Sequence, residues 1–279
     1  DVVVDSMDEV AVRMRALSAV KNTMGRKVVC IGGASGWGRG GRQAPERAKE
    51  IWKMELPEVT YEDLKARLIK ARGDAALNRS AKLQAADYLK QKDVKLETTR
   101  ESVENAFVLR DVFRNILAEH GTDSITVNHC MGAIMPISET TACMTLSLLN
   151  DEGALAFCES DFAVIPSGIL LNAISGIPVF LNDPTYPHDQ IITLAHCTAP
   201  RKMDGKHMEP VRILTHFESD YGAAPKVAMK IGQKLTNIIP DFNGKRWVGF
   251  TGALEGNPFL PICRSQIDVG FKCATEKMA

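Results

Sequence analysis

Short apolar runs alternate with longer amphipathic stretches over the first two thirds of the chain. Runs rich in β-branched residues are typical of buried parallel strands, whereas apolar residues that recur every three or four positions are typical of helices. The predicted strands cover residues 27–33, 124–130, 154–160 and 177–183. The predicted helices cover residues 5–24, 44–54, 97–120, 140–149 and 161–175, and residues 131–139 are expected to form a loop. This alternation predicts a parallel α/β sheet.

The pattern changes near residue 184. Beyond it the chain shows short alternating runs separated by turn residues, which are antiparallel signals typical of a sandwich or barrel. These runs cover residues 190–199, 211–219, 225–240 and 245–256. We therefore predict a Rossmann-like α/β sheet domain over residues 1–185, with residues 5–24 as an N-terminal linking helix. An antiparallel β-rich, barrel-like C-terminal domain is expected over residues 186–279, and it is expected to be incomplete.

The charge balance limits the classes of partner. Lys plus Arg and Asp plus Glu number 34 each, so there is no net field to attract nucleic acid or an anionic membrane. No apolar stretch is long enough to span a bilayer, and the acidic start does not resemble a signal peptide. We expect a cytoplasmic protein that acts on a small neutral substrate.

The seven cysteines show no metal-binding pattern in the sequence. Their number is odd, no pair has C-x-x-C spacing, and several lie in apolar runs. Reduced, mostly buried thiols in a reducing compartment are the expectation, and a zinc–thiolate site is not. The cysteines are Cys30, Cys130, Cys143, Cys158, Cys197, Cys263 and Cys273.

A glycine-rich loop over residues 34–42 follows the first predicted strand, which itself ends in Gly32 and Gly33. A dinucleotide fingerprint would need an acidic residue about 20 positions further on, at the end of a second strand, and a phosphate-binding P-loop would need a Gly-Lys-Ser/Thr run. Neither pattern is met. A tight crossover loop that lines a pocket is the favoured interpretation, and an oxidoreductase that uses this loop is a lesser alternative.

Carboxylates gather where the third predicted strand ends. Glu159 and Asp161 are two positions apart, so in a strand they would point to the same side, at the edge where open α/β sheets bind ligands. Two carboxylates there suit a hard divalent cation. Alternatively, Asp161 caps the next helix and Glu159 is a solvated charge. Glu139, after the preceding strand, either faces the same cavity or is a first-turn helix acid.

Three histidines lie near the ends of apolar runs: His129, His196 and His216. A lone histidine is more often a hydrogen-bonded core or surface group than a ligand. Several histidines at strand ends, together with carboxylates at strand ends, favour a shared pocket. No H-E-x-x-H motif is present, so a zinc hydrolase is not expected.

Six short motifs occur in an order that resembles the L-fucose isomerase-like family, which is also similar to L-arabinose isomerases. The resemblance covers roughly residues 25–270. The motifs are LLNDEGALAFCESD (148–161), PVFLNDP (178–184), ITLAHCTAP (192–200), ILTHFES (213–219), IGQKLT (231–236) and NPFLPICRSQ (257–266).

The resemblance implies an architecture and a metal. Family members have two α/β domains and a C-terminal barrel-like domain, of which this chain would hold the last two. They form trimers or hexamers with active sites between subunits, so a homo-oligomer is expected. Their metal, usually Mn²⁺, is bound by a Glu, an Asp and a His. The Asp falls on Asp161, the Glu falls by count at about Cys143 with Glu139 one helical turn earlier, and the His would lie beyond the end of this chain.

The resemblance also implies a reaction, the metal-dependent aldose–ketose isomerisation of an open-chain sugar through an ene-diol. Asp161 would be the primary metal ligand, Glu159 or Glu139 the second ligand or the base, and Asp161 and Glu139 the catalytic pair. His129, His196 and His216 would bind sugar hydroxyls. The alternative is a non-catalytic carbohydrate-binding relative with a degenerate site, which the cysteine at the position of the family's Glu favours.

Overall fold

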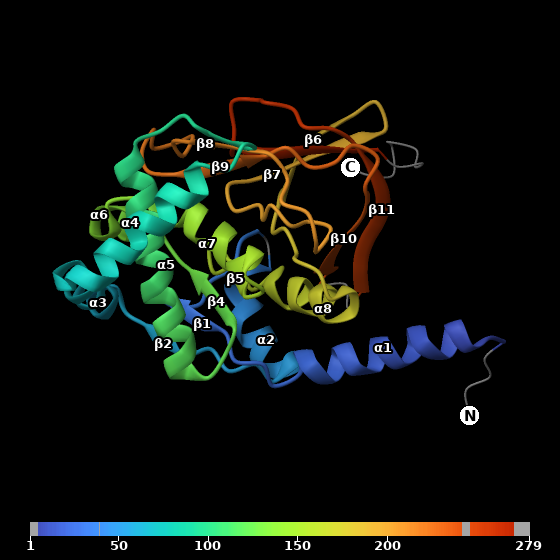
Figure 1. Cartoon of the computed structure of the whole chain (residues 1–279). Helices are drawn as coiled ribbons and strands as arrows, with labels where there is room; N and C mark the ends of the chain where they lie inside the picture. The colour runs from blue at the N-terminus through green and yellow to red at the C-terminus, as the bar shows by residue number, and fades with distance from the viewer. Residues whose placement is uncertain (1–4, 39, 242–245, 271–279) are drawn as a thin grey trace.

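The computed structural model describes residues 5–38, 40–241 and 246–270 of the chain. Two sheets of different kinds dominate it, one parallel and one antiparallel (Figure 1), so the predicted fold class is confirmed. The parallel sheet has the order β2 (Glu58–Val59), β1 (Val29–Ile31), β4 (Ser124–Val127) and β5 (Leu155–Phe157). Every residue of β1, β4 and β5 is buried, as expected for parallel strands covered on both faces.

Helices cover both faces of the parallel sheet, and alternating strand residues divide between them. Val28 and Cys30 pack with α2 (Ala44–Trp52) and α8 (Ile165–Ser175). Val29 and Ile31 belong to the larger core on the opposite face. That face carries α3 (Tyr61–Gly73), α4 (Ala75–Leu89), α5 (Arg100–His120) and α7 (Ala142–Asp151). The two cores account for the continuous hydrophobic runs of the strands.

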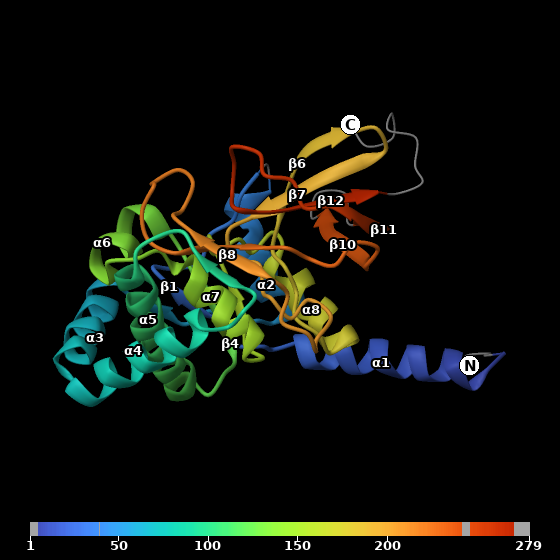
Figure 2. The same ribbon diagram turned by 45° about the horizontal axis from the view of Figure 1, so that its top comes forward.

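The N-terminal helix α1 (Met7–Thr23) begins at its cap residue Ser6 and packs along α8. Its far end projects from the body of the molecule in both views (Figures 1 and 2). The apolar stripe that predicted this helix is largely exposed, with 66% of Met14 and 72% of Leu17 accessible. The helix therefore exists as expected, but α8 covers only part of its apolar face.

The antiparallel sheet has the order β10 (Lys234–Asp241), β11 (Arg246–Gly256), β12 (Ser265–Gly270), β7 (Ile191–His196) and β6 (Asp183–His188). Strand β12 lies beside β7, with Ser265 opposite His196. The hairpin of β6 and β7 stands at the upper right in Figure 2. This register places the end of β7 next to the start of β12, which brings Cys197 near the residues that precede Ser265.

A small third sheet joins the two halves of the chain. Strand β3 (Val94–Leu96) pairs in parallel with β8 (Val211–Leu214), which pairs antiparallel with β9 (Ala224–Val227). The larger hydrophobic core likewise contains residues from both halves, such as Phe113 and Val227. The division at residue 185 therefore stays a prediction.

Two predicted local structures differ in the fold. Residues 177–182 do not form the predicted parallel strand, although Val179 and Leu181 still pack beside α8. The chain instead joins the antiparallel sheet at β6. The loop expected at residues 131–139 is instead mostly helical. It consists of a π-helical turn, η2 (Cys130–Ile134), and the short α6 (Met135–Ser138). In its described residues, the glycine loop forms an isolated bridge between Ser35 and Asp161 and leads into the 3-10 turn η1 (Gly41–Gln43).

Candidate functional site

The segment after β5 turns sharply at the carboxyl end of the parallel sheet. Glu159 and Ser160 have φ angles of 62° and 47°, so two consecutive non-glycine residues adopt the left-handed conformation. Such residues cost about 1–3 kcal/mol each and persist only where the surrounding structure holds them. The predicted strand over residues 154–160 ends earlier, at Phe157, so strand alternation does not place Glu159 beside Asp161.

Asp161 has a clear structural role. Its Oδ1 accepts the backbone N–H of Ala163 and the backbone N–H of Trp37, both at 3.0 Å. Ser35 in the glycine loop adds backbone hydrogen bonds with Ser160 and Phe162. Asp161 is not the N-cap of α8, as the capping alternative expected, because that position is Val164, which has no side-chain cap. One carboxylate oxygen of Asp161 instead closes the turn before α8 and ties the glycine loop to it. Burial raises the pKa of Asp161.

Glu159 is half-buried and lies among other charged groups. Burial raises the pKa of Glu159, His196 opposes that shift, and Asp183 adds to it. Within the described ranges, no group hydrogen-bonds the carboxylate of Glu159. The structure therefore brings Glu159, Asp161 and His196 within electrostatic reach of one another, with the exposed Asp183 alongside.

His196, the last residue of β7, is buried with 3% of its surface accessible. Its Nδ1 accepts the backbone N–H of Cys197 at 2.9 Å and lies 3.2 Å from the hydroxyl of Thr198. Because a backbone amide can only donate, the neutral ring carries its proton on Nε2. That Nε2 is buried without a partner in the described part of the chain, as is the hydroxyl of Ser160. An unpaired buried donor costs about 1–3 kcal/mol, which a bound oxygen would offset.

Other predicted residues lie elsewhere. Glu139 follows α6 with a φ of 55°, and its exposed carboxylate forms an ion pair with Arg72 at 3.0 Å. This surface pair is an unsuitable place for the predicted catalytic base. His129 is exposed and precedes η2 with a φ of 44°, so it does not line a buried pocket. His216 is buried, but it joins a group of cysteines.

That group was missed by sequence reasoning. Donor atoms of Cys143, Cys197 and His216 all lie within 4.8 Å of one another, and the three residues are buried. The thiol of Cys130 interacts with that of Cys143, and the thiol of Cys263 interacts with that of Cys197. The hydrogen bond with the thiol of Cys143, followed by that of Cys263, lowers the pKa of Cys197. Sequence spacing gave no sign of this group, because Cys143 and Cys197 lie 54 positions apart and Cys197 and His216 lie 19 positions apart.

The described cysteines are all free thiols, four of them buried, as expected for a reduced protein. Cys273 lies outside the described residues. The convergence of Cys143 and Cys197 with His216 nevertheless forms a set of atoms that could hold a metal ion, which the cysteine spacing did not indicate. The resemblance places the family's metal-binding Glu at about Cys143, and the structure places that cysteine among soft ligands rather than carboxylates.

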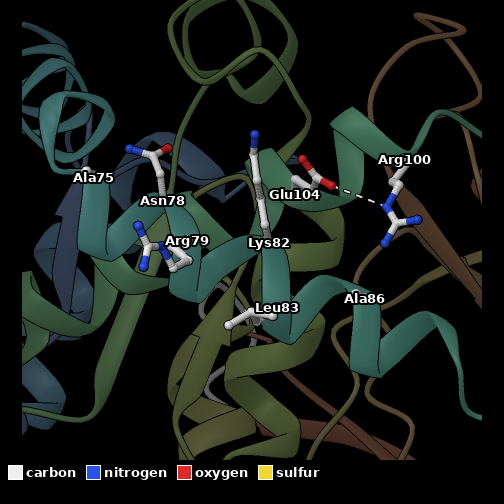
Figure 3. Close-up of a pocket in the computed structure, with 8 residues that line it drawn as sticks. All are labelled: Ala75, Asn78, Arg79, Lys82, Leu83, Ala86, Arg100 and Glu104. Carbon is white, nitrogen blue, oxygen red and sulfur yellow. Dashed lines mark hydrogen bonds and ion pairs between the residues drawn. The ribbon is translucent and has the colours of Figure 1, made fainter.

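A surface hollow of about 540 Å³ lies along α4 and the start of α5 (Figure 3). Arg79, Lys82 and Arg100 give it a basic rim, and Arg100 is paired with Glu104 at 3.3 Å. Its lining contains neither a histidine nor a thiol. Glu159, His196 and the Cys143–Cys197–His216 group therefore do not line this hollow.

Comparison with protein-family models and with curated proteins finds no match to this chain. The resemblance to L-fucose isomerase-like proteins thus rests on the short motifs alone. In the part of the chain that the structure describes, no helix combines the length and the apolar character needed to cross a membrane.

Proposed function

We propose that this protein is an aldose–ketose isomerase in which Glu159 transfers a proton between C1 and C2 of an open-chain sugar. The observation that carries the proposal is that two polar groups without hydrogen-bond partners lie near each other at the sheet edge. Glu159 is held in a left-handed turn with no hydrogen bond to its carboxylate from the described residues, and the nearby His196 buries a ring N–H without a partner. Strain and unpaired polar groups concentrate at functional sites.

Glu159 has the character that a general base needs. Burial raises its pKa towards the working pH, which favours both taking up and returning a proton. In the proposed reaction the carboxylate removes the proton from C2 of the aldose and returns it to C1. A second proton moves from the hydroxyl on C2 to the oxygen on C1, so that the ene-diol becomes the ketose without net loss of atoms or electrons.

His196 would stabilise the negative charge that develops on the sugar oxygen. The N–H of Cys197 fixes the ring orientation and leaves Nε2–H as the free donor. A fixed donor in a site from which water is excluded stabilises an oxyanion more strongly than water does. His196 thereby keeps its predicted substrate-binding role, now with a specific atom.

The expected Mn²⁺ site does not fit the described residues. One oxygen of Asp161 already accepts two backbone N–H groups. Among the described residues, the only set of three ligand atoms within 4.8 Å of one another is the Cys143–Cys197–His216 group, which is soft rather than oxygen-rich. Asp161 and Glu159 would need further donors to bind a hard cation, and the proton transfers above therefore use residues of this chain alone.

A carbohydrate-binding relative without catalysis is the second candidate. The structural use of one Asp161 oxygen to close the turn before α8 and the cysteine at the position of the family's Glu favour it. Both candidates share a small neutral sugar as ligand. Assembly into trimers or hexamers and a cytoplasmic location are further parts of the proposal, which light scattering and cell fractionation test.

Solvent exchange separates the two candidates. The protein is incubated in D₂O with a panel of aldoses that includes L-fucose and L-arabinose, with and without Mn²⁺, and NMR detects deuterium at C1 or C2. We expect exchange with the wild type and a loss of at least about 100-fold in Glu159→Gln, within the range for general-base catalysis. Glu119→Gln, which alters only an exposed ion pair with Arg67, is the matched control.

Binding of a sugar without exchange would support the non-catalytic candidate and overturn the isomerase. Exchange that persists unchanged in Glu159→Gln would show that the base is another residue. His196→Gln should lower exchange about 100-fold or more, as loss of an oxyanion donor does.

A further inference from the structure

Three separate parts of the fold contribute to the cluster of Cys143, Cys197 and His216. Cys143 lies in the first turn of α7, Cys197 follows β7, and His216 lies two residues after β8. Their donor atoms are mutually within 4.8 Å. Because these elements belong to the helical layer and to two different sheets, the convergence depends on tertiary packing and not on local spacing.

Burial makes this convergence informative. Cys143 and Cys197 are each 2% accessible, and they pack against Ala224 with the partly buried Cys263 beside them. A thiol is a weak hydrogen-bond donor and a weak acceptor, so a buried chain of thiols is poorly satisfied by its own contacts. The same sulfur atoms, when deprotonated, are strong ligands for a soft cation.

We infer that Cys143, Cys197 and His216 bind Zn²⁺, with Cys263 as the fourth ligand. Three thiolates and one imidazole make a closed tetrahedral set of the kind that structural zinc sites use. Cys263 is assigned as the fourth ligand because it packs against the cluster of Cys143, Cys197 and Ala224 and its thiol interacts with that of Cys197. It lies outside the set of atoms that are mutually within 4.8 Å, so its side chain would move inward to complete the site. Binding releases one proton from each thiol that is protonated beforehand.

Groups around the ligands suit this role. The backbone N–H of Arg264 donates to the sulfur of Cys197 at 3.4 Å, and such a contact stabilises a thiolate. His216 has Ser219 Oγ 3.2 Å from Nδ1 and Glu218 Oε2 3.1 Å from Nε2. The nitrogen that binds Zn²⁺ gives up its present partner, and the other keeps its partner and holds the ring in place.

A metal at this position would fasten α7, β7, β8 and the segment before β12 to one another. It would also fix the chain immediately after His196, at the end of β7. The inference does not depend on the isomerase proposal, since the ligands and the readouts below are independent of catalysis.

The test uses Co²⁺ as a spectroscopic substitute for Zn²⁺. The full chain is prepared under reducing conditions, treated with a chelator and titrated with Co²⁺, and its absorption spectrum is recorded. We expect one Co²⁺ per chain, with a sulfur-to-cobalt charge-transfer band and intense visible bands of tetrahedral cobalt, all of which Zn²⁺ abolishes. Cys143→Ala and Cys197→Ala should bind at least about 100-fold more weakly, because loss of a direct ligand exceeds the effect of an outer-shell change.

Cys30→Ala is the matched control, because Cys30 is an equally buried thiol in the other hydrophobic core. Cys263→Ala should weaken the charge-transfer band, whereas Cys130→Ala should leave it in place. A wild-type spectrum without a charge-transfer band overturns the inference, and so does a band that persists in Cys143→Ala and Cys197→Ala.

A second measurement covers variants that fail to fold. Alkylation of the wild type is followed at each cysteine by mass spectrometry, with and without Zn²⁺. We expect Zn²⁺ to slow alkylation of Cys143, Cys197 and Cys263 at least about 10-fold and to leave Cys30 unaffected. If these three cysteines are alkylated at the same rate with and without Zn²⁺, the proposed zinc site is contradicted, regardless of how the variants behave.

Discussion

The guanidinium of Arg212 donates two hydrogen bonds to the carboxylate of Glu97, from Nε to Oε1 at 2.8 Å and from Nη2 to Oε2 at 2.6 Å. Glu97 directly follows β3, and Arg212 lies in β8. The ion pair therefore lies at the end of the parallel ladder between β3 and β8, which joins the first half of the chain to the second. Lys95 adds a third contact to Glu97 at 2.9 Å.

This ion pair should make the free energy of unfolding depend on pH. The hydrogen bond with Arg212, followed by that with Lys95, lowers the pKa of Glu97 to about 2 from its ordinary value of 4.5. A carboxylate with a lowered pKa stabilises the fold fully above its unfolded value and loses this contribution as the pH falls towards 2. Because Glu97 is partly exposed, we expect Glu97→Gln to lower the free energy of unfolding by only about 1 kcal/mol at pH 7.

Urea unfolding of the wild type and Glu97→Gln at pH 7, 4 and 2.5 measures the effect. The difference between the two proteins should shrink steadily as the pH falls. Glu104→Gln removes an exposed pair within α5 and should change stability by less than about 0.5 kcal/mol. A difference that is constant with pH would show that the ion pair is not its source.

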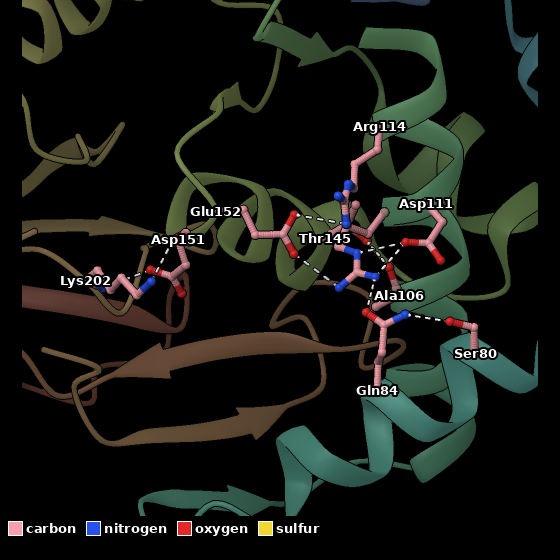
Figure 4. A network of polar contacts seen from close by, with 10 residues as sticks. Ser80, Gln84, Ala106, Asp111, Arg114, Thr145, Asp151, Glu152 and Lys202 are labelled. Atoms are coloured by element: carbon pink, nitrogen blue, oxygen red, sulfur yellow. Dashed lines mark hydrogen bonds and ion pairs between the residues drawn. The ribbon is translucent and has the colours of Figure 1, made fainter. Parts of the chain in front are cut away.

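Arg110 is a buried cation on α5, and its side chain is 4% accessible. It donates to Gln84 and Asp111 at 2.6 Å each and to Glu152 at 3.2 Å. Figure 4 labels these three partners. Arg110→Met leaves these acceptors without their donor, and we expect a loss of about 3 kcal/mol, as for other broken buried pairs. The measurement is chemical denaturation.

Arg114→Met provides the comparison, because Arg114 is 57% accessible and lies 3.9 Å from the same Glu152. It should change stability by less than about 0.5 kcal/mol. Equal effects of the two substitutions would mean that burial of the network contributes nothing.

Gly222 approaches the start of α7 closely. Its φ is +72°, and a Cβ there would lie 2.5 Å from the backbone nitrogen of Thr141. Gly222→Ala should therefore lower the free energy of unfolding by about 1–3 kcal/mol. Gly132→Ala is the control, since Gly132 has an ordinary φ and open space around its Cβ position, and it should be neutral or slightly stabilising. Thermal unfolding that ranks the two variants in the opposite order would contradict this account.

Glu159→Gly tests whether the left-handed turn carries strain for the sake of function. Glycine adopts a φ of 62° freely, so we expect stability to rise by up to about 1 kcal/mol while sugar exchange is lost. Lys53→Gly is matched, because Lys53 has a φ of 56° at the exposed end of α2. It should gain similar stability and keep full activity. Loss of stability in Glu159→Gly alone would show that the side chain supports the fold.

The amino-acid sequence by itself determined the elements whose causes are local. The apolar runs at β1, β4 and β5 are buried strands, and α5 begins at its cap residue Thr99 and ends at Gly121. Periodicity, caps and glycine stops act over a few residues, so they can be read without a structure. The change from parallel to antiparallel strands near residue 184 was predicted for the same reason.

Only the tertiary structure decided which side chains meet. The left-handed turn at Glu159 replaced the expected strand alternation, and Glu139 formed a surface ion pair instead of joining Asp161. Cys143 and Cys197 came together with His216 because α7, β7 and β8 pack against one another. Contacts between residues far apart in the chain are set by how the layers pack, and local sequence patterns carry no information about that packing.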